Sequence, residues 1–151
     1  YLTAQLDIRQ GGYLFNGTEQ LLDVYGVSAK TLERERGTIV FPGVTSAGTP
    51  NTTAIAINQN YYNSLPTEEY VHKNNWVKLR EISLGYSFRP AGADFIRSID
   101  VGVFGRNLFL WTKVPHIDPE SSSFGTGNAQ GVSRFAFPTT RSFGVNLKVQ
   151  F

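Results

Sequence analysis

The most constraining feature of this sequence is a strict alternation of apolar and polar residues across residues 141–151. The apolar set is Phe143, Val145, Leu147, Val149 and Phe151, and the intervening set is Gly144, Asn146, Lys148 and Gln150. Successive side chains of a β-strand point to opposite faces, so the pattern predicts a strand with one apolar and one polar face. The strand stops on an aromatic residue without a polar tail, which is unusual for the last strand of a soluble domain.

Three further segments have the same two-residue period, at about 2–15, 76–88 and 97–111. Each segment is long enough for a tilted membrane strand, which needs roughly 9–11 residues. The pair Gly11-Gly12 is expected to loosen or bulge the first of them. Helical periodicity is nearly absent. The sequence therefore predicts an all-β fold of four antiparallel strands.

The connections between these strands are uneven. Residues 89–96 form a short turn with Pro90 and Gly92, whereas residues 16–75 and 112–140 form long loops. If the last strand starts at the outer side, both long loops fall on that side. Two such loops are uncommon in a compact soluble domain, and they are typical of transmembrane β-barrels, which have short periplasmic turns and long extracellular loops.

Composition excludes several other classes of protein. Charged residues make up 17% and aromatic residues 13% of the chain, which does not fit a disordered tail. No apolar run approaches the roughly 20 residues of a membrane-spanning helix. The absence of cysteine excludes disulfides and thiolate metal sites, and a net charge of +2 is too small to indicate a nucleic-acid partner.

The long loops contain weaker local patterns. Residues 18–26 predict a short helix with Thr18 as N-cap and Gly26 at its end. Residues 29–36 fit a second charged turn, although a solvated loop edge is the favoured interpretation. A helical turn is also expected at 67–70. Asp118 and Glu120 are expected to order a turn rather than to bind a metal.

Five motifs resemble segments of one protein family, and they occur along this chain in the same order as in that family. Residues 75–88 contain VKLREISLGY, residues 105–112 read GRNLFLWT, residues 117–120 contain Asp-Pro-Glu, residues 137–143 read FPTTRSF, and residues 9–16 resemble an upstream strand end. Together they resemble the C-terminal part of SusC/RagA-type TonB-dependent outer-membrane transporters. The resemblance runs from about residue 4 to residue 151.

The resemblance implies that residues 1–151 are the last four strands of a large transmembrane barrel of about 22 strands, a size that holds an internal plug. The plug domain and the segment that contacts TonB would lie upstream, and this segment alone would not transport. The family imports glycan or peptide nutrients across the outer membrane of Bacteroidetes. Its expected partners are a SusD-like surface lipoprotein, the TonB complex, the substrate and the lipid bilayer. We expect no enzymatic activity, cofactor or metal.

Candidate functional residues fall into three groups. Aromatic residues near the outer ends of strands could stack on substrate; they are Tyr61, Tyr62, Tyr70 and Trp76. The alternative is the interfacial aromatic belt, which is the favoured role for Trp111 and also fits Trp76. Polar residues of the strands are expected to face the barrel lumen and to form salt bridges there; they are Asp7, Arg9, Glu81, Asp100, Arg106 and Lys148. The apolar residues Phe143, Val145, Leu147, Val149 and Phe151 are expected to face lipid.

One alternative from another class remains open. The chain could be a secreted or surface β-sandwich that binds carbohydrate, with the apolar residues of 141–151 in its core. A sandwich needs a second sheet with a matching apolar face, and four strands with long loops barely supply one.

Overall fold

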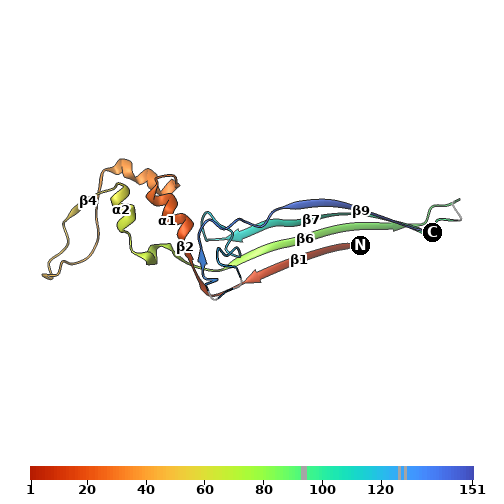
Figure 1. The fold of residues 1–151 in the computed structure, drawn as a ribbon, viewed down its shortest axis with the longest axis horizontal. Helices are drawn as coiled ribbons and strands as arrows, with labels where there is room; N and C mark the ends of the chain where they lie inside the picture. Colours follow the sequence, from red (N-terminus) through yellow and green to blue (C-terminus); the bar gives the residue numbers. More distant parts are fainter. Residues whose placement is uncertain (93–94, 126, 128) are drawn as a thin grey trace.

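The computed structural model describes residues 1–92, 95–125, 127 and 129–151. The molecule is elongated, with a four-stranded sheet at one end and a head of short helices and strands at the other (Figure 1). The sheet is antiparallel with the order β1-β6-β7-β9. Its strands are β1 Leu2–Arg9, β6 Trp76–Phe88, β7 Ser98–Thr112 and β9 Ser142–Gln150.

The two-residue period predicted these strands well, with one correction. The predicted strand 76–88 coincides with β6, and the predictions for β7 and β9 differ by one residue at each end. The predicted strand 2–15 is wrong, because β1 ends at Arg9 and Tyr13–Asn16 forms β2 of another sheet. Gly11 and Gly12 have φ of +88° and +78°, which only glycine adopts easily, and they redirect the chain.

The head is built from the two long connections between the strands of the large sheet. Its three-stranded sheet has the order β5-β2-β8, with β2 and β8 parallel, and β3 and β4 form a separate hairpin. Its elements are β2 Tyr13–Asn16, α1 Gly17–Val24, η1 Ala29–Arg36, β3 Thr38–Val40, β4 Ala54–Ala56, α2 Gln59–Ser64, η2 Thr67–Tyr70, β5 Val71–Lys73 and β8 Val132–Ser133.

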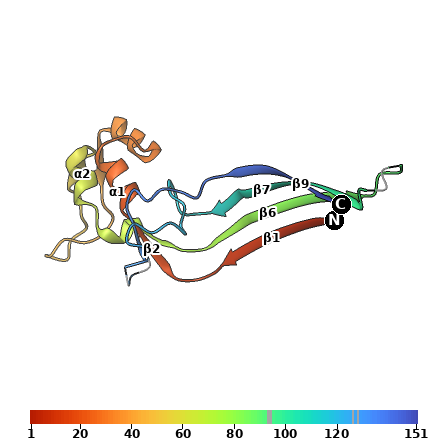
Figure 2. The same ribbon diagram turned by 45° about the vertical axis from the view of Figure 1, so that its right-hand side comes forward.

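Both long connections leave the sheet at the same end, as the sequence predicted (Figure 2). They are not wholly irregular, because they form the helices and short strands of the head. The helical turn expected at 67–70 is confirmed as η2, and residues 29–36 form a 3-10 helix rather than a simple loop edge. The head also contains most of the buried apolar side chains, including Leu14, Tyr62 and Tyr70.

A bulge in β6 keeps the two faces of the large sheet distinct. Gln5 pairs with Glu81 and Leu6 pairs with Leu79, so Arg80 has no partner on β1. The bulge reverses the parity of β6, and the odd-numbered residues Val77 and Leu79 therefore share a face with the even-numbered Ile82 and Leu84. The pairing of β6 with β7 is irregular at the same place, because Leu79 pairs with Phe109 and Glu81 pairs with Arg106. Asn107 of β7 lies within this irregularity and has a φ of +52°.

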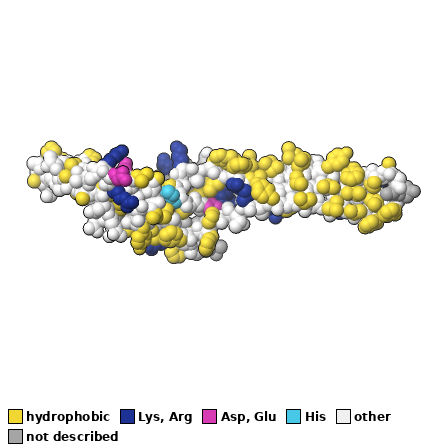
Figure 3. Space-filling view, turned by 90° about the horizontal axis from the view of Figure 1, so that it is seen from above, with side chains coloured by type: hydrophobic (Ala, Val, Ile, Leu, Met, Phe, Trp, Pro, Cys, Tyr) yellow, Lys and Arg dark blue, Asp and Glu magenta, His cyan; other side chains and the backbone are white. Residues whose placement is uncertain are grey.

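The resulting apolar face is open to the surroundings. Leu2 is 71% exposed, Leu84 56%, Val103 50% and Val145 74%. Figure 3 shows hydrophobic side chains spread over the sheet end of the molecule. A contiguous exposed apolar surface of this kind marks an interaction with another protein or with a membrane.

Asn16 is the last residue of β2 and the N-cap of α1. The prediction that Thr18 caps this helix is therefore wrong. Asn16 Oδ1 accepts a hydrogen bond from the backbone N–H of Glu19 (3.0 Å), and its Nδ2 donates to the carbonyl oxygen of Pro115 (2.8 Å). Thr18 instead accepts a hydrogen bond from the backbone N–H of Phe135 (2.7 Å). The contacts to Pro115 and Phe135 join the 113–141 segment to the end of β2 and the start of α1.

An Asn16→Ala substitution is expected to destabilise the head by about 2 kcal/mol, because it removes the cap and leaves the Pro115 carbonyl without its donor. Faster hydrogen exchange of the α1 amides would report the loss. Asn16→Ser keeps an acceptor for the cap and should lose about half as much. Equal exchange in the original protein and the alanine variant would contradict this role.

Candidate functional site

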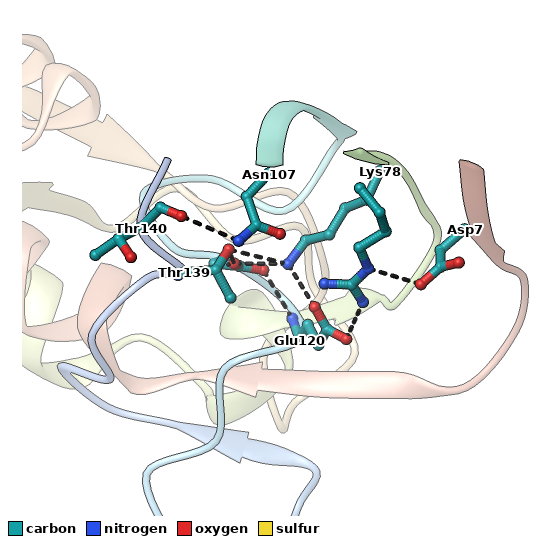
Figure 4. A network of polar contacts seen from close by, with 8 residues as sticks. Asp7, Lys78, Asn107, Glu120, Thr139 and Thr140 are labelled. Carbon is teal, nitrogen blue, oxygen red and sulfur yellow. Dashed lines mark hydrogen bonds and ion pairs between the residues drawn. The ribbon is translucent and has the colours of Figure 1, made fainter. Parts of the chain in front are cut away.

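A network of charged side chains lies where the polar face of the sheet meets the 113–141 segment. Lys78 on β6 is 3% exposed. Its Nζ lies 2.7 Å from Asp118 Oδ2 and 2.6 Å from Glu120 Oε2. Figure 4 shows the Lys78 ammonium pointing toward Glu120 and Thr139. Two carboxylates around one buried ammonium satisfy a charge that would be costly to bury alone.

Arg80, the bulged residue of β6, extends this network across the sheet. Its Nε donates to Asp7 Oδ2 on β1 (2.6 Å), and its Nη2 donates to Glu120. The ring of Trp76 lies beneath both cations, 5.6 Å from Lys78 Nζ and 5.9 Å from the guanidinium carbon of Arg80. The bulge therefore brings Arg80 toward the polar side, where it can bridge a strand and a loop.

Asp118 connects the two ends of the 113–141 segment. Its Oδ2 accepts from Thr139 Oγ1 (2.8 Å) and from the Thr139 backbone N–H (3.3 Å), while its Oδ1 accepts from the Glu120 backbone N–H (3.1 Å). We call Asp7, Lys78, Arg80, Asp118, Glu120 and Thr139 the anchoring network. The prediction that Asp118 and Glu120 order a turn is confirmed, and they also fasten that turn to the sheet.

The contacts of the anchoring network keep both carboxylates ionised. Burial alone would raise the pKa of Asp118, but hydrogen bonds from Lys78, Glu120 N–H and Thr139 outweigh it and lower the pKa below its usual value. For Glu120, the hydrogen bond from Arg80 is the largest cause, and it lowers the pKa despite burial. A carboxyl whose pKa is lowered by folding stabilises the fold above its unfolded pKa and loses that contribution as pH falls through its folded pKa.

The anchoring network is therefore expected to hold at neutral and mildly acidic pH and to weaken only below about pH 4, the usual range of a carboxyl. The difference in fluorescence between the complete protein and its Trp76→Phe variant would report the change, because Trp76 lies against Lys78 and Arg80. The signal should be flat from pH 8 to about pH 5. A midpoint near pH 6 would contradict an origin in these carboxylates.

The six polar strand residues predicted to share a face do so. The strand register aligns Gln5, Glu81, Arg106 and Ser142 in one row and Ser87, Asp100 and Lys148 in another. Asp7 and Arg9 align with Lys78 and Trp76 of the same face. Arg106 Nε donates to Glu81 Oε2 (2.8 Å), an ion pair of the kind the sequence predicted for this face.

The predicted lipid-facing residues of the last strand lie on the opposite, apolar face. Phe143, Val145 and Leu147 are 67–75% exposed, and Val149 is partly covered. Phe151 follows the end of β9 and stacks on Phe95, with ring centroids 6.5 Å apart.

The four aromatic residues predicted to contact substrate lie in different environments. Tyr62, Tyr70 and Trp76 are only 3%, 0% and 8% exposed, so these three rings pack within the chain. Burial raises the pKa of the Tyr70 hydroxyl. Tyr61 is partly exposed and stacks on Phe41 at 5.7 Å, beside a pocket that Asn58 and Asn60 also line. A substrate-stacking role now depends on Tyr61 alone.

The sequence patterns gave no prediction of a structural role for Lys78, Arg80 or Asn16. A usable signal was present for the bulge, because apolar residues change from odd to even positions between Leu79 and Ile82. Within the described ranges, no helix is long and apolar enough to cross a membrane, and no three His, Asp or Glu side chains gather as a possible metal site.

Comparison with known proteins finds similarity to TonB-dependent receptors. The chain is 34% identical to TonB-dependent receptor P26 of Formosa agariphila over 92 residues, which is 57% of this chain and 9% of the relative. It is 27% identical over 128 residues to TonB-dependent receptor P39 of the same organism, covering 83% of this chain and 12% of the relative. No family model matches the chain.

The fold also resembles part of a solved transporter. The RagAB peptide importer in its "closed-closed" state matches 95% of this chain and 15% of its own chain, with a TM-score of 0.54 and 15% identity. The resemblance to TonB-dependent receptors that the motifs predicted is thus confirmed. The chain spans only about a tenth of the length of these curated relatives.

Proposed function

We propose that this chain is the C-terminal barrel segment of an outer-membrane importer that takes up glycan or peptide nutrients with energy from TonB. The observation that carries the proposal is the sheet itself. One face is apolar and exposed, and the other carries ion-paired polar residues, as expected for strands between lipid and a lumen. The similarity to TonB-dependent receptors supports the same function.

In this proposal, the chain's own residues bind and guide rather than react. Phe143, Val145, Leu147, Val149 and Phe151 would face lipid. The polar face would line the lumen or contact the plug, and its ion pairs would hold the wall rigid while the substrate passes. The remaining strands of a barrel of about 22 would come from outside this chain, since open strand edges are not tolerated in lipid.

The head would lie at the external mouth of the barrel, because both long connections leave the sheet at one end. A SusD-like lipoprotein would close over this end, and Tyr61 with Asn58 and Asn60 would offer a stacking surface and hydrogen bonds to a sugar or peptide. TonB would act through parts of the protein upstream of this chain.

The test uses the complete protein in its own cells. An antibody to residues 141–151 should detect it in the outer-membrane fraction at a mass far above the 16.8 kDa of this chain. Uptake of a fluorescent oligosaccharide or oligopeptide pool should fall to background when tonB is deleted. A soluble protein near 16.8 kDa, or uptake independent of TonB, would overturn the proposal.

A secreted β-sandwich that binds carbohydrate is the weaker candidate. It would need a second sheet packed on the apolar residues of β9, and within the described ranges these residues are instead largely exposed.

A further inference from the structure

A groove of about 710 Å³ lies where the large sheet meets the head. Its apolar side is a row of three residues from three adjacent strands, since Ile8 pairs with Val77 and Val77 pairs with Trp111. These residues are at the head end of the exposed apolar face. Ile8 is 67% and Trp111 53% exposed.

The polar side of the groove carries an excess of positive charge. Arg9, Lys73 and Lys113 line it, and all three are exposed. No Asp or Glu is among its lining residues. In the part of the chain that the structure describes, none of these three cations has an ion-pair partner, in contrast to Lys78, Arg80 and Arg106 on the same sheet.

The combination of an apolar row and unpaired cations at one level of the sheet has a specific chemical meaning. Tryptophan is enriched at the membrane–water interface, where its ring contacts both the acyl chains and the headgroups. Lysine and arginine at that level attract anionic lipids. Trp111 stacks on Phe109 (5.7 Å) toward the middle of the apolar face, which continues the row into the region that would contact acyl chains.

We infer that this groove binds the phosphate headgroup of an anionic lipid, with Lys73 and Lys113 around the phosphate and Ile8, Val77 and Trp111 against the acyl chains. The inference rests on the proposed function, because it requires the apolar face to contact a bilayer. The bound lipid would fix the head at a set height above the membrane surface.

The test is a lipid titration of the complete protein, purified in a neutral detergent and analysed by native mass spectrometry. Dioctanoyl phosphatidic acid is the probe, and dioctanoyl phosphatidylcholine and inorganic phosphate are the comparison ligands. Replacing both lysines, Lys73→Gln with Lys113→Gln, should weaken binding of phosphatidic acid on the order of tenfold. The matched control, Arg34→Gln with Arg36→Gln on η1, removes the same charge from the head and should leave binding unchanged.

A charge-retaining pair, Lys73→Arg with Lys113→Arg, separates loss of charge from loss of structure and should bind like the original protein. Equal affinity of the glutamine pair and the original protein would overturn the inference. So would phosphatidylcholine binding as tightly as phosphatidic acid, or inorganic phosphate displacing the lipid at equal concentration. If instead the protein is absent from the outer-membrane fraction, the proposed function fails first.

Discussion

An Asp118→Ala substitution is expected to detach the 113–141 segment from the sheet. Lys78 and Asp118 side chains are 3% and 4% exposed, so the change leaves a buried ammonium with only Glu120 as its counter-ion. Removing one partner of a buried pair costs about 3–5 kcal/mol, and the remaining carboxylate places this case near the low end. It also removes the acceptor of two hydrogen bonds from Thr139. Hydrogen exchange across residues 113–141 of the complete protein would measure the change.

Glu81→Ala is the matched control for this prediction. It breaks the Arg106–Glu81 pair on the same face, but Arg106 is 58% exposed, and exposed pairs contribute only about 0–1 kcal/mol. Exchange in the 113–141 segment should therefore remain slow. If the two alanine variants show the same exchange, the anchoring network does not hold the segment.

The strands were predictable because their signal is local. In β9, Val145 and Leu147 alternate with Asn146 and Lys148, and this pattern alone assigns the faces. The bulge at Arg80 was missed because a strict period of two was assumed through 76–88. That period would have placed Lys78 among Ile82 and Leu84 on the apolar face, a contradiction that only an extra residue resolves.

The anchoring network was beyond a local pattern because its members are distant in sequence. Lys78 meets Asp118 across 40 residues, and Arg80 meets Asp7 across 73. The Asp-Pro-Glu motif predicts a turn, but it does not indicate which cations pair with its two carboxylates. The same limit applies to Tyr62 and Tyr70, which were predicted to lie in the long loop at 16–75 as possible substrate contacts and which the packing of α1, α2 and η2 buries.

A Val145→Arg substitution is expected to remove most of the folded protein from the outer membrane. Val145 lies in the middle of β9, is 74% exposed and faces the apolar side. An arginine facing lipid near the bilayer midplane costs about 2–4 kcal/mol, a large share of the 5–15 kcal/mol that stabilises a typical fold. The measurement is the amount of folded protein in the outer-membrane fraction, detected by its altered mobility before and after heating.

The neighbouring residue provides a control at the same depth. Asn146 is also exposed but lies on the polar face, opposite Gly102, where a long charged side chain can reach water. Asn146→Arg should therefore leave the amount of folded protein within about twofold of the original, because a charged residue facing the lumen carries no lipid penalty. If both variants are inserted equally well, the apolar face does not contact lipid and the barrel orientation proposed for this chain is wrong. A loss in both variants would show that β9 tolerates no added bulk, and Val145→Thr, which adds polarity without volume, would then decide between the two faces.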